Sequence, residues 1–146
     1  MAVVGQHFVD VTGVSFNGVA ATSFTVADPE HLNATVPVGA TTGPISVSNS
    51  AGTGTTAASF TVVAPPTVTS FSPPDGPFGT VVTITGTSFT SATAVRFNGL
   101  LASFVVMNPT TIRATVPVGA TNGPISVTNP GGTGASSSHF IVTVVP

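Results

Sequence analysis

Apolar and polar residues alternate along much of the chain, in short segments that glycine and proline interrupt. In the second half this pattern predicts seven strands, at residues 66–71, 81–86, 94–97, 101–107, 111–116, 124–129 and 139–145. A turn is expected after the first strand, at residues 73–77, and Asn98-Gly99 predicts a tight hairpin. No helix is expected, because no window combines good helix formers with a period of about 3.6 residues.

Seven short strands spaced by roughly 8–12 residues are typical of an immunoglobulin-like β-sandwich, in which two sheets pack face to face. The expected fold class is therefore all-β. The inward side of these strands is expected to include six apolar residues of the second half: Ile84, Val95, Phe97, Ile112, Val127 and Phe140. A shift of one residue in any strand would turn its apolar side outward.

A long internal repeat divides the chain. The 21 residues of segment 34–54 recur as segment 114–134 with four mismatches, and Phe16-Asn17-Gly18 recurs as Phe97-Asn98-Gly99. The period of about 80 residues exceeds that of a solenoid unit, about 20–50 residues, and suits a small autonomous domain. The chain is therefore expected to contain two domains of the same kind.

We predict these domains at residues 1–65 and 66–146, joined by a short segment that two prolines stiffen, so that adjacent domains would keep a nearly fixed angle. The first domain is N-terminally incomplete, since Met1–Val4 aligns with Val82–Thr85 and the counterpart of the residues before that is missing. Either the sequence begins within a domain, or a neighbouring chain supplies the missing strand to the open sheet edge. The last residues, 144–146, resemble 62–65, which favours a longer array of repeats.

The motifs of the second domain resemble those of a known family. The run from Gly79 to Phe89 reads Gly-Thr-x-Val-x-Ile-x-Gly-x-x-Phe and is followed by Val95-x-Phe97-x-Gly99. This pattern is similar to the IPT/TIG domain, the immunoglobulin-like fold shared by plexins, some transcription factors and many bacterial surface proteins. The resemblance covers residues 66–146 and, less completely, 1–65. It implies the fold and leaves the function open, because function belongs to sites rather than to folds.

Charge is scarce along the chain. Four acidic and two basic residues give a formal net charge of −2. Only Arg96 and Arg113 could contact phosphates, so no nucleic-acid partner is expected, although the transcription-factor branch of the resembled family binds DNA. No apolar run is long enough to span a bilayer and Met1–Val4 does not resemble a signal peptide, so any export signal would lie outside this sequence. The absence of cysteine excludes disulfides.

No catalytic, cofactor-binding or metal site is predicted, and the chain is not expected to be an enzyme. Asp28, Glu30 and His31 form the one local cluster of metal-ligating residue types, but the other copy has Pro109-Thr110-Thr111 there, which favours an ordinary turn. His7 and His139 correspond to serines in the opposite copies. No motif of a serine nucleophile is present.

Carbohydrate binding is a weaker expectation. Sugar platforms use flat rings with a polar edge, and the chain has no tryptophan or tyrosine, while its ten phenylalanines fall mostly at core positions. IPT/TIG domains also accompany starch-acting enzymes, so the resemblance keeps this alternative open. Asn33-Ala34-Thr35 is a formal glycosylation sequon, but Arg113 replaces the asparagine in the other copy, and we assign it no role.

The favoured hypothesis is a non-enzymatic, extracellular structural or spacer repeat of a cell-surface, fibre or virion protein. Its partners would be other repeats or copies of itself, and a homopolymer could form by strand complementation of the incomplete first domain. The alternative is an accessory carbohydrate-binding or linker module of a secreted enzyme that acts on polysaccharides. No cofactor is expected in either case.

Overall fold

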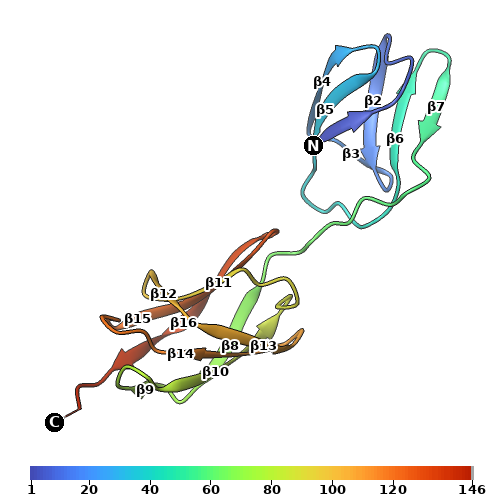
Figure 1. Ribbon diagram of the computed structural model, residues 1–146. Coiled ribbons are helices and arrows are strands. Elements are labelled where there is room, and N and C mark those ends of the chain that lie inside the picture. Colours follow the sequence, from blue (N-terminus) through green and yellow to red (C-terminus); the bar gives the residue numbers. More distant parts are fainter. Residues whose placement is uncertain (146) are drawn as a thin grey trace. The chain divides into compact units, whose positions relative to one another are not determined.

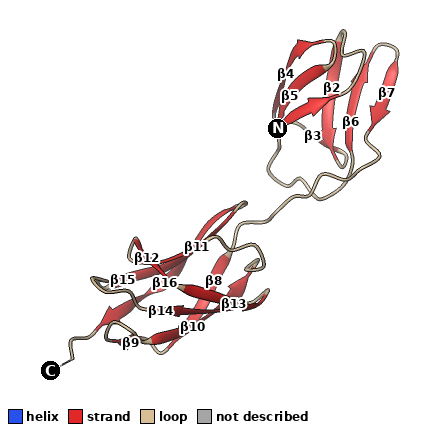
Figure 2. Ribbon diagram, in the orientation of Figure 1, coloured by secondary structure: helices blue, strands red, loops and turns tan. Residues whose placement is uncertain are grey.

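The computed structural model describes residues 1–145, and all regular structure in them is β-strand, as expected (Figures 1 and 2). None of these residues forms a helix that could cross a membrane. The chain divides into two compact units, Met1–Val62 and Val63–Pro146, and each contains two sheets that enclose an apolar core. The predicted end of the second domain, at residue 146, lies outside the described residues.

The first unit has a three-stranded and a four-stranded sheet (Figure 1). The smaller sheet has the order β1-β5-β4 and the larger has the order β3-β2-β6-β7. Their bounds are β1 (Ala2–Val4), β2 (Val11–Phe16), β3 (Val19–Ala20), β4 (Ser23–Asp28), β5 (His31–Thr35), β6 (Ile45–Asn49) and β7 (Gly52–Thr55).

The second unit repeats this plan with two additional strands, β8 and β9. One sheet has the order β13-β14-β10-β8, and the other has the order β12-β11-β15-β16-β9. Their bounds are β8 (Thr67–Ser72), β9 (Asp75–Gly76), β10 (Val81–Thr87), β11 (Ala94–Phe97), β12 (Leu100–Ala102), β13 (Phe104–Asn108), β14 (Thr111–Thr115), β15 (Gly123–Asn129) and β16 (Gly132–Val142).

The two cores are built in the same way. All six predicted inward residues of the second unit are at most 1% exposed, which confirms the predicted register. The rings of Phe97 and Phe140 meet edge to face with centroids 5.3 Å apart, and the corresponding pair in the first unit, Phe16 and Phe60, lies 5.4 Å apart. Such pairs contribute about 0.5–1.5 kcal/mol beyond the area that they bury.

The repeated Asn-Gly motif organises one end of each unit. Asn98 and Gly99 have φ angles of 44° and 87°, so both central residues of the hairpin turn are left-handed, as this turn type requires. The Asn98 amide donates a 2.9 Å hydrogen bond to the hydroxyl of Thr121, and a Cβ added at Gly123 would overlap the Asn98 side chain. Asn17 makes the same bond to Thr41. This contact explains why two separated motifs recur together.

Three predictions about the strands need correction. The strand expected at 101–107 is two strands, because the chain leaves β11 after Ala102 and joins β14 from Phe104, on the opposite sheet. The strand expected at 139–145 begins at Gly132, where a glycine-rich segment that lacks apolar alternation pairs with β15. The expected turn at 73–77 includes the short strand β9, which runs parallel to the end of β16.

The first unit has no counterpart of β8. In the second unit β10 lies between β14 and β8, whereas the corresponding β1 pairs only with β5 and is an edge strand. The loss of cover also reaches the facing sheet: Val127 is 0% exposed, while its counterpart Val47 is half-buried. The strand missing from the sequence repeat is therefore missing from the sandwich as well.

The segment that leads into β8 provides a hydrogen-bond acceptor for a buried asparagine, Asn129. The Asn129 amide donates hydrogen bonds to the carbonyls of Ala64 and Ser88, both at 2.9 Å, and its side-chain oxygen accepts one from the amide of Gly131 at 2.7 Å. The Asn129 side chain itself is buried, at 4% exposed. The counterpart Asn49 is half-buried; its amide makes longer bonds, of 3.2 and 3.3 Å, and its oxygen accepts one from the Ala51 amide at 2.9 Å.

We predict that Asn129→Ala lowers the free energy of unfolding of the second unit by about 2–4 kcal/mol, because it removes three hydrogen bonds made by a side chain that is 4% exposed. Asn49→Ala, the matched change, should cost the first unit less than about 1.5 kcal/mol, since water can replace the lost bonds. Hydrogen exchange read by mass spectrometry in increasing urea reports the two units separately. Equal losses in the two units would contradict this account.

Candidate binding groove

A groove of about 590 Å³ lies on the first unit. It runs between the free edge of β1 and the larger sheet, and its lining consists of residues 3–8 together with Ile45, Val47, Asn49 and residues 51–56. Its position corresponds to the place that β8 occupies in the second unit, between β10 and β16. The groove is therefore the space left by the missing strand.

The groove floor is apolar. Val3, Phe8 and Ile45 belong to the core cluster of this unit, and Val47 packs against them. Val3 and Phe8 are 6% and 9% exposed, whereas their counterparts Ile84 and Phe89 are both 0% exposed. The core of the first unit is thus thinly covered on this side.

Glycines line the groove wall and leave it open. A Cβ added at Gly54 or Gly52 would meet no atom within 4 Å. At the counterpart Gly134 an added Cβ would overlap the carbonyl of Pro66, and at Gly132 it would lie 3.2 Å from the Pro65 side chain. In the second unit these glycines admit the backbone that leads into β8, and in the first unit the same room is empty.

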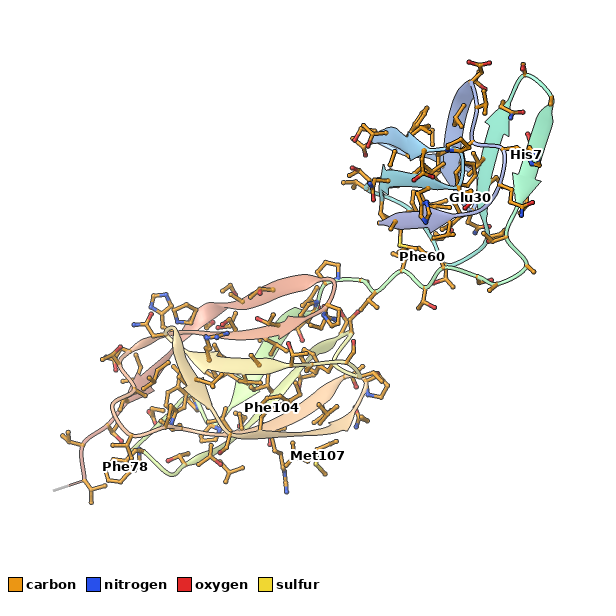
Figure 3. The ribbon with its side chains drawn as sticks, turned by 45° about the horizontal axis from the view of Figure 1, so that its top comes forward. His7, Glu30, Phe60, Phe78, Phe104 and Met107 are labelled. Carbon is orange, nitrogen blue, oxygen red and sulfur yellow. The ribbon has the colours of Figure 1, made fainter. Side chains whose placement is uncertain are left out.

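Six polar side chains line the groove: Gln6, His7, Asn49, Thr53, Thr55 and Thr56. His7 has a left-handed backbone with φ of 59°, like its counterpart Ser88 with φ of 60°, and its carbonyl accepts the bond from Asn49 (His7 is labelled in Figure 3). The imidazole is exposed. No second titratable side chain lines the groove. This composition suits recognition of backbone and apolar side chains and gives no acid–base pair.

The predicted cluster of Asp28, Glu30 and His31 forms a turn between β4 and β5. The Asp28 carboxylate accepts a 2.8 Å hydrogen bond from the Glu30 amide and lies 2.9 Å from Nδ1 of His31. The Glu30 amide, followed by the His31 side chain, lowers the pKa of Asp28 below its ordinary value. Among residues 1–145 no group of three side chains is arranged to hold a metal ion.

The remaining candidates are scattered over both units. Arg113 is exposed on β14 and Arg96 is half-buried on β11, in opposite sheets of the second unit. His139 is exposed on β16, beside a hollow of about 200 Å³ that also includes Phe71 of β8. Asn33 of the sequon is exposed on β5. The fold does not bring these residues together into one site.

The aromatic rings are mostly internal. Phe78, which is 60% exposed in the loop between β9 and β10, is the one phenylalanine of the described residues that is not buried or half-buried. Phe60 and Phe104 are half-buried (all three are labelled in Figure 3). A flat platform for a sugar normally needs an exposed ring with a polar edge, and a single phenylalanine provides only the apolar face.

Solved structures with the same fold include one crystallised with a xylogluco-oligosaccharide, which is 26% identical with a TM-score of 0.50 and matches 96% of this chain and 36% of that chain. A protein of Bacteroides thetaiotaomicron named as a candidate phosphatase has 26% identity and a TM-score of 0.50 over 54% of this chain and 18% of that chain. The protein SGBP-B of a xyloglucan utilization locus in Bacteroides uniformis has 19% identity and a TM-score of 0.49, over 96% and 44%.

The chain spans less than half the length of each of these proteins. No curated protein matches the chain significantly. The family model of the IPT/TIG domain matches residues 66–142, which is more than half of the chain and includes β8 through β16. The chain therefore belongs to the IPT/TIG domain family.

Proposed function

We propose that this chain is a non-enzymatic scaffold module of an extracellular or cell-surface protein that binds polysaccharide. The role is that of the linker module named above as the alternative, and the sugar itself is held elsewhere in the assembly. The observation that supports it is the likeness over both units at once, 96% of the chain, to a protein crystallised with a xylogluco-oligosaccharide. The activity of the candidate phosphatase is not transferred, since the match covers 54% of this chain and only 18% of that protein.

The physical character of the surface fits a spacer better than a sugar site. Phe78 is the one exposed phenylalanine of the described residues, so stacking on a sugar would depend on a single ring. Charged residues are few, and the exposed side chains include valines, leucines and methionines beside hydroxyls and glycines. What the chain offers is two β-sandwich units.

The fibre hypothesis favoured by sequence receives less support. No comparison points to a filament or a virion, and a homopolymer rests only on the open edge of the first unit. We therefore rank the glycan-associated scaffold first, which reverses the order given by sequence alone.

The short connection between the units is the mechanical feature of such a scaffold. The Val62 amide donates a 3.0 Å hydrogen bond to Thr42 in the first unit, and the Ala64 carbonyl is held by Asn129 in the second. Only Val63 stands between these two hydrogen-bonded residues.

We predict that the isolated chain does not bind xyloglucan, while the native protein that contains it does. Native gels with and without xyloglucan should show equal mobility for the purified chain and for Phe78→Ala, because the platform for stacking is absent. The native protein, recovered from its cells with an antibody against this chain, should be retained on immobilised xyloglucan and be degraded by protease added to intact cells.

Retardation of the isolated chain that Phe78→Ala abolishes would instead make the chain itself the sugar-binding module. A native protein that is protected from protease in intact cells, or that binds no polysaccharide, would exclude the proposed function.

A further inference from the structure

We propose that the groove of the first unit is a docking site for an extended polypeptide strand. The strand it fits has the chemistry of this chain's own residues 64–72: two prolines, followed by four hydroxyl side chains with Val68 and Phe71 among them. It would lie antiparallel to β1 and complete the smaller sheet. This inference is independent of any role with polysaccharide.

The second unit indicates which strand would fit the groove, because its β8 occupies the corresponding place. In the second unit β8 pairs with β10 through Ser72 opposite Thr83, Phe71 opposite Ile84 and Ser70 opposite Thr85. The counterparts of these three β10 residues in β1 are Ala2, Val3 and Val4. The docked strand is expected in the same register.

The free edge of β1 has the hydrogen-bonding groups that such a strand needs. The Met1 carbonyl and the Gly5 amide are bonded toward β5, each at 2.9 Å. In an antiparallel pair successive residues direct these groups to opposite sides, so those of Ala2 and Val4 face the groove. An unpaired edge of this kind is a template for strand addition.

The groove also has room for a backbone where the second unit has one. The carbonyl of Pro66 lies where a Cβ at Gly134 would be, and that of Thr67 lies where a Cβ at Gly86 would be. The first unit keeps glycine at both counterparts. At Gly5 an added Cβ would overlap the Phe8 ring of the same unit, whereas at Gly54 it would meet no atom within 4 Å. Gly54 therefore leaves open space where the second unit has the Pro66 carbonyl.

Two apolar side chains of the incoming strand would find contacts. Val68 and Phe71 pack on the core of the second unit, and the Phe71 ring lies 6.2 Å from Phe140. The counterpart Phe60 is half-buried, whereas Phe140 is 1% exposed, so a ring at the Phe71 position would cover it. The Asn49 amide would exchange its 3.3 Å bond to the Val9 carbonyl for an incoming carbonyl, as Asn129 bonds to Ala64.

A polypeptide strand explains this groove better than a sugar does. Its floor lacks an exposed ring, and the β1 edge beside it presents backbone amides and carbonyls. Strand addition satisfies those groups in a continuous ladder and buries the apolar floor in the same step.

The test uses the full chain and a synthetic peptide of residues 64–72 with blocked ends. We expect saturable binding and slower hydrogen exchange of the Val4 amide, measured by nuclear magnetic resonance. A peptide with Val68→Asp and Phe71→Asp should not bind, because its charges would enter the apolar floor.

Gly54→Val is the informative variant, since its Cβ would enter the open room and meet no atom of the free chain within 4 Å. It should weaken peptide binding at least about tenfold, which corresponds to about 1.4 kcal/mol. Gly13→Val, on β2 outside the groove and also in open space, should bind like the original chain.

Failure of the peptide to bind at millimolar concentration would overturn the proposal, and so would equal binding by the Gly54→Val chain. Analytical ultracentrifugation tests the other occupant, a second copy of the chain that pairs β1 with β1. A dimer that the peptide does not dissociate would show that the edge serves self-association and that the proposed strand is wrong.

Discussion

The second unit depends on the close approach of one backbone segment to a row of glycines. Residues 63–67 pass over Gly131, Gly132 and Gly134 of the β15–β16 hairpin and over Gly86 of β10, where any side chain would collide with carbonyl oxygens or a proline ring. This approach places β8 against β10 and lets Asn129 reach the Ala64 carbonyl. Once β8 is seated, both sheets are covered on that side and the core residues fall to 0–1% exposure.

The first unit shows the same sandwich without that segment. Its core, its Asn-Gly hairpin and its edge-to-face phenylalanine pair are retained, since they depend on contacts within the strands that are present. What changes is local to the vacated side: β1 becomes an edge, Val47 and Asn49 gain exposure, and a groove opens. Both units have the contacts that the sandwich needs in order to form. Only the second unit has the β8 segment that covers the side left open in the first.

The groups that the two units present on their surfaces limit what the chain can bind. The fold brings one small group of titratable side chains together, Asp28 with Glu30 and His31 at the β4–β5 turn, and it packs its paired rings inside the cores. The β1 edge is one of several open sheet edges, and it lies beside an apolar groove floor. Recognition by such surfaces is recognition of another polypeptide, and for that reason we place polysaccharide contact outside this chain and strand docking within it.

Much of this protein could be predicted from the sequence, because local patterns determined it. The alternation of apolar and polar residues predicted the all-β class and the buried positions of the second unit. Asn98-Gly99 predicted a hairpin, since both residues accept left-handed backbone angles. The repeat showed that the first unit lacks a strand. These features depend on side-chain periodicity and on backbone preferences, which short stretches of sequence contain.

Only the tertiary structure decided the rest. The switch between sheets after Ala102 and the early start of β16 at Gly132 depend on pairing with distant strands, and a glycine-rich segment has no alternation to reveal it. Arg113 lies on β14 in one sheet of the second unit, whereas Arg96 on β11 and His139 on β16 lie in the other sheet, where β15 separates their strands. The open space beside Gly54 could not be predicted from the sequence either. Gly54 and Gly134 are identical in sequence, and only the structure shows that a backbone segment passes over Gly134 and none passes over Gly54.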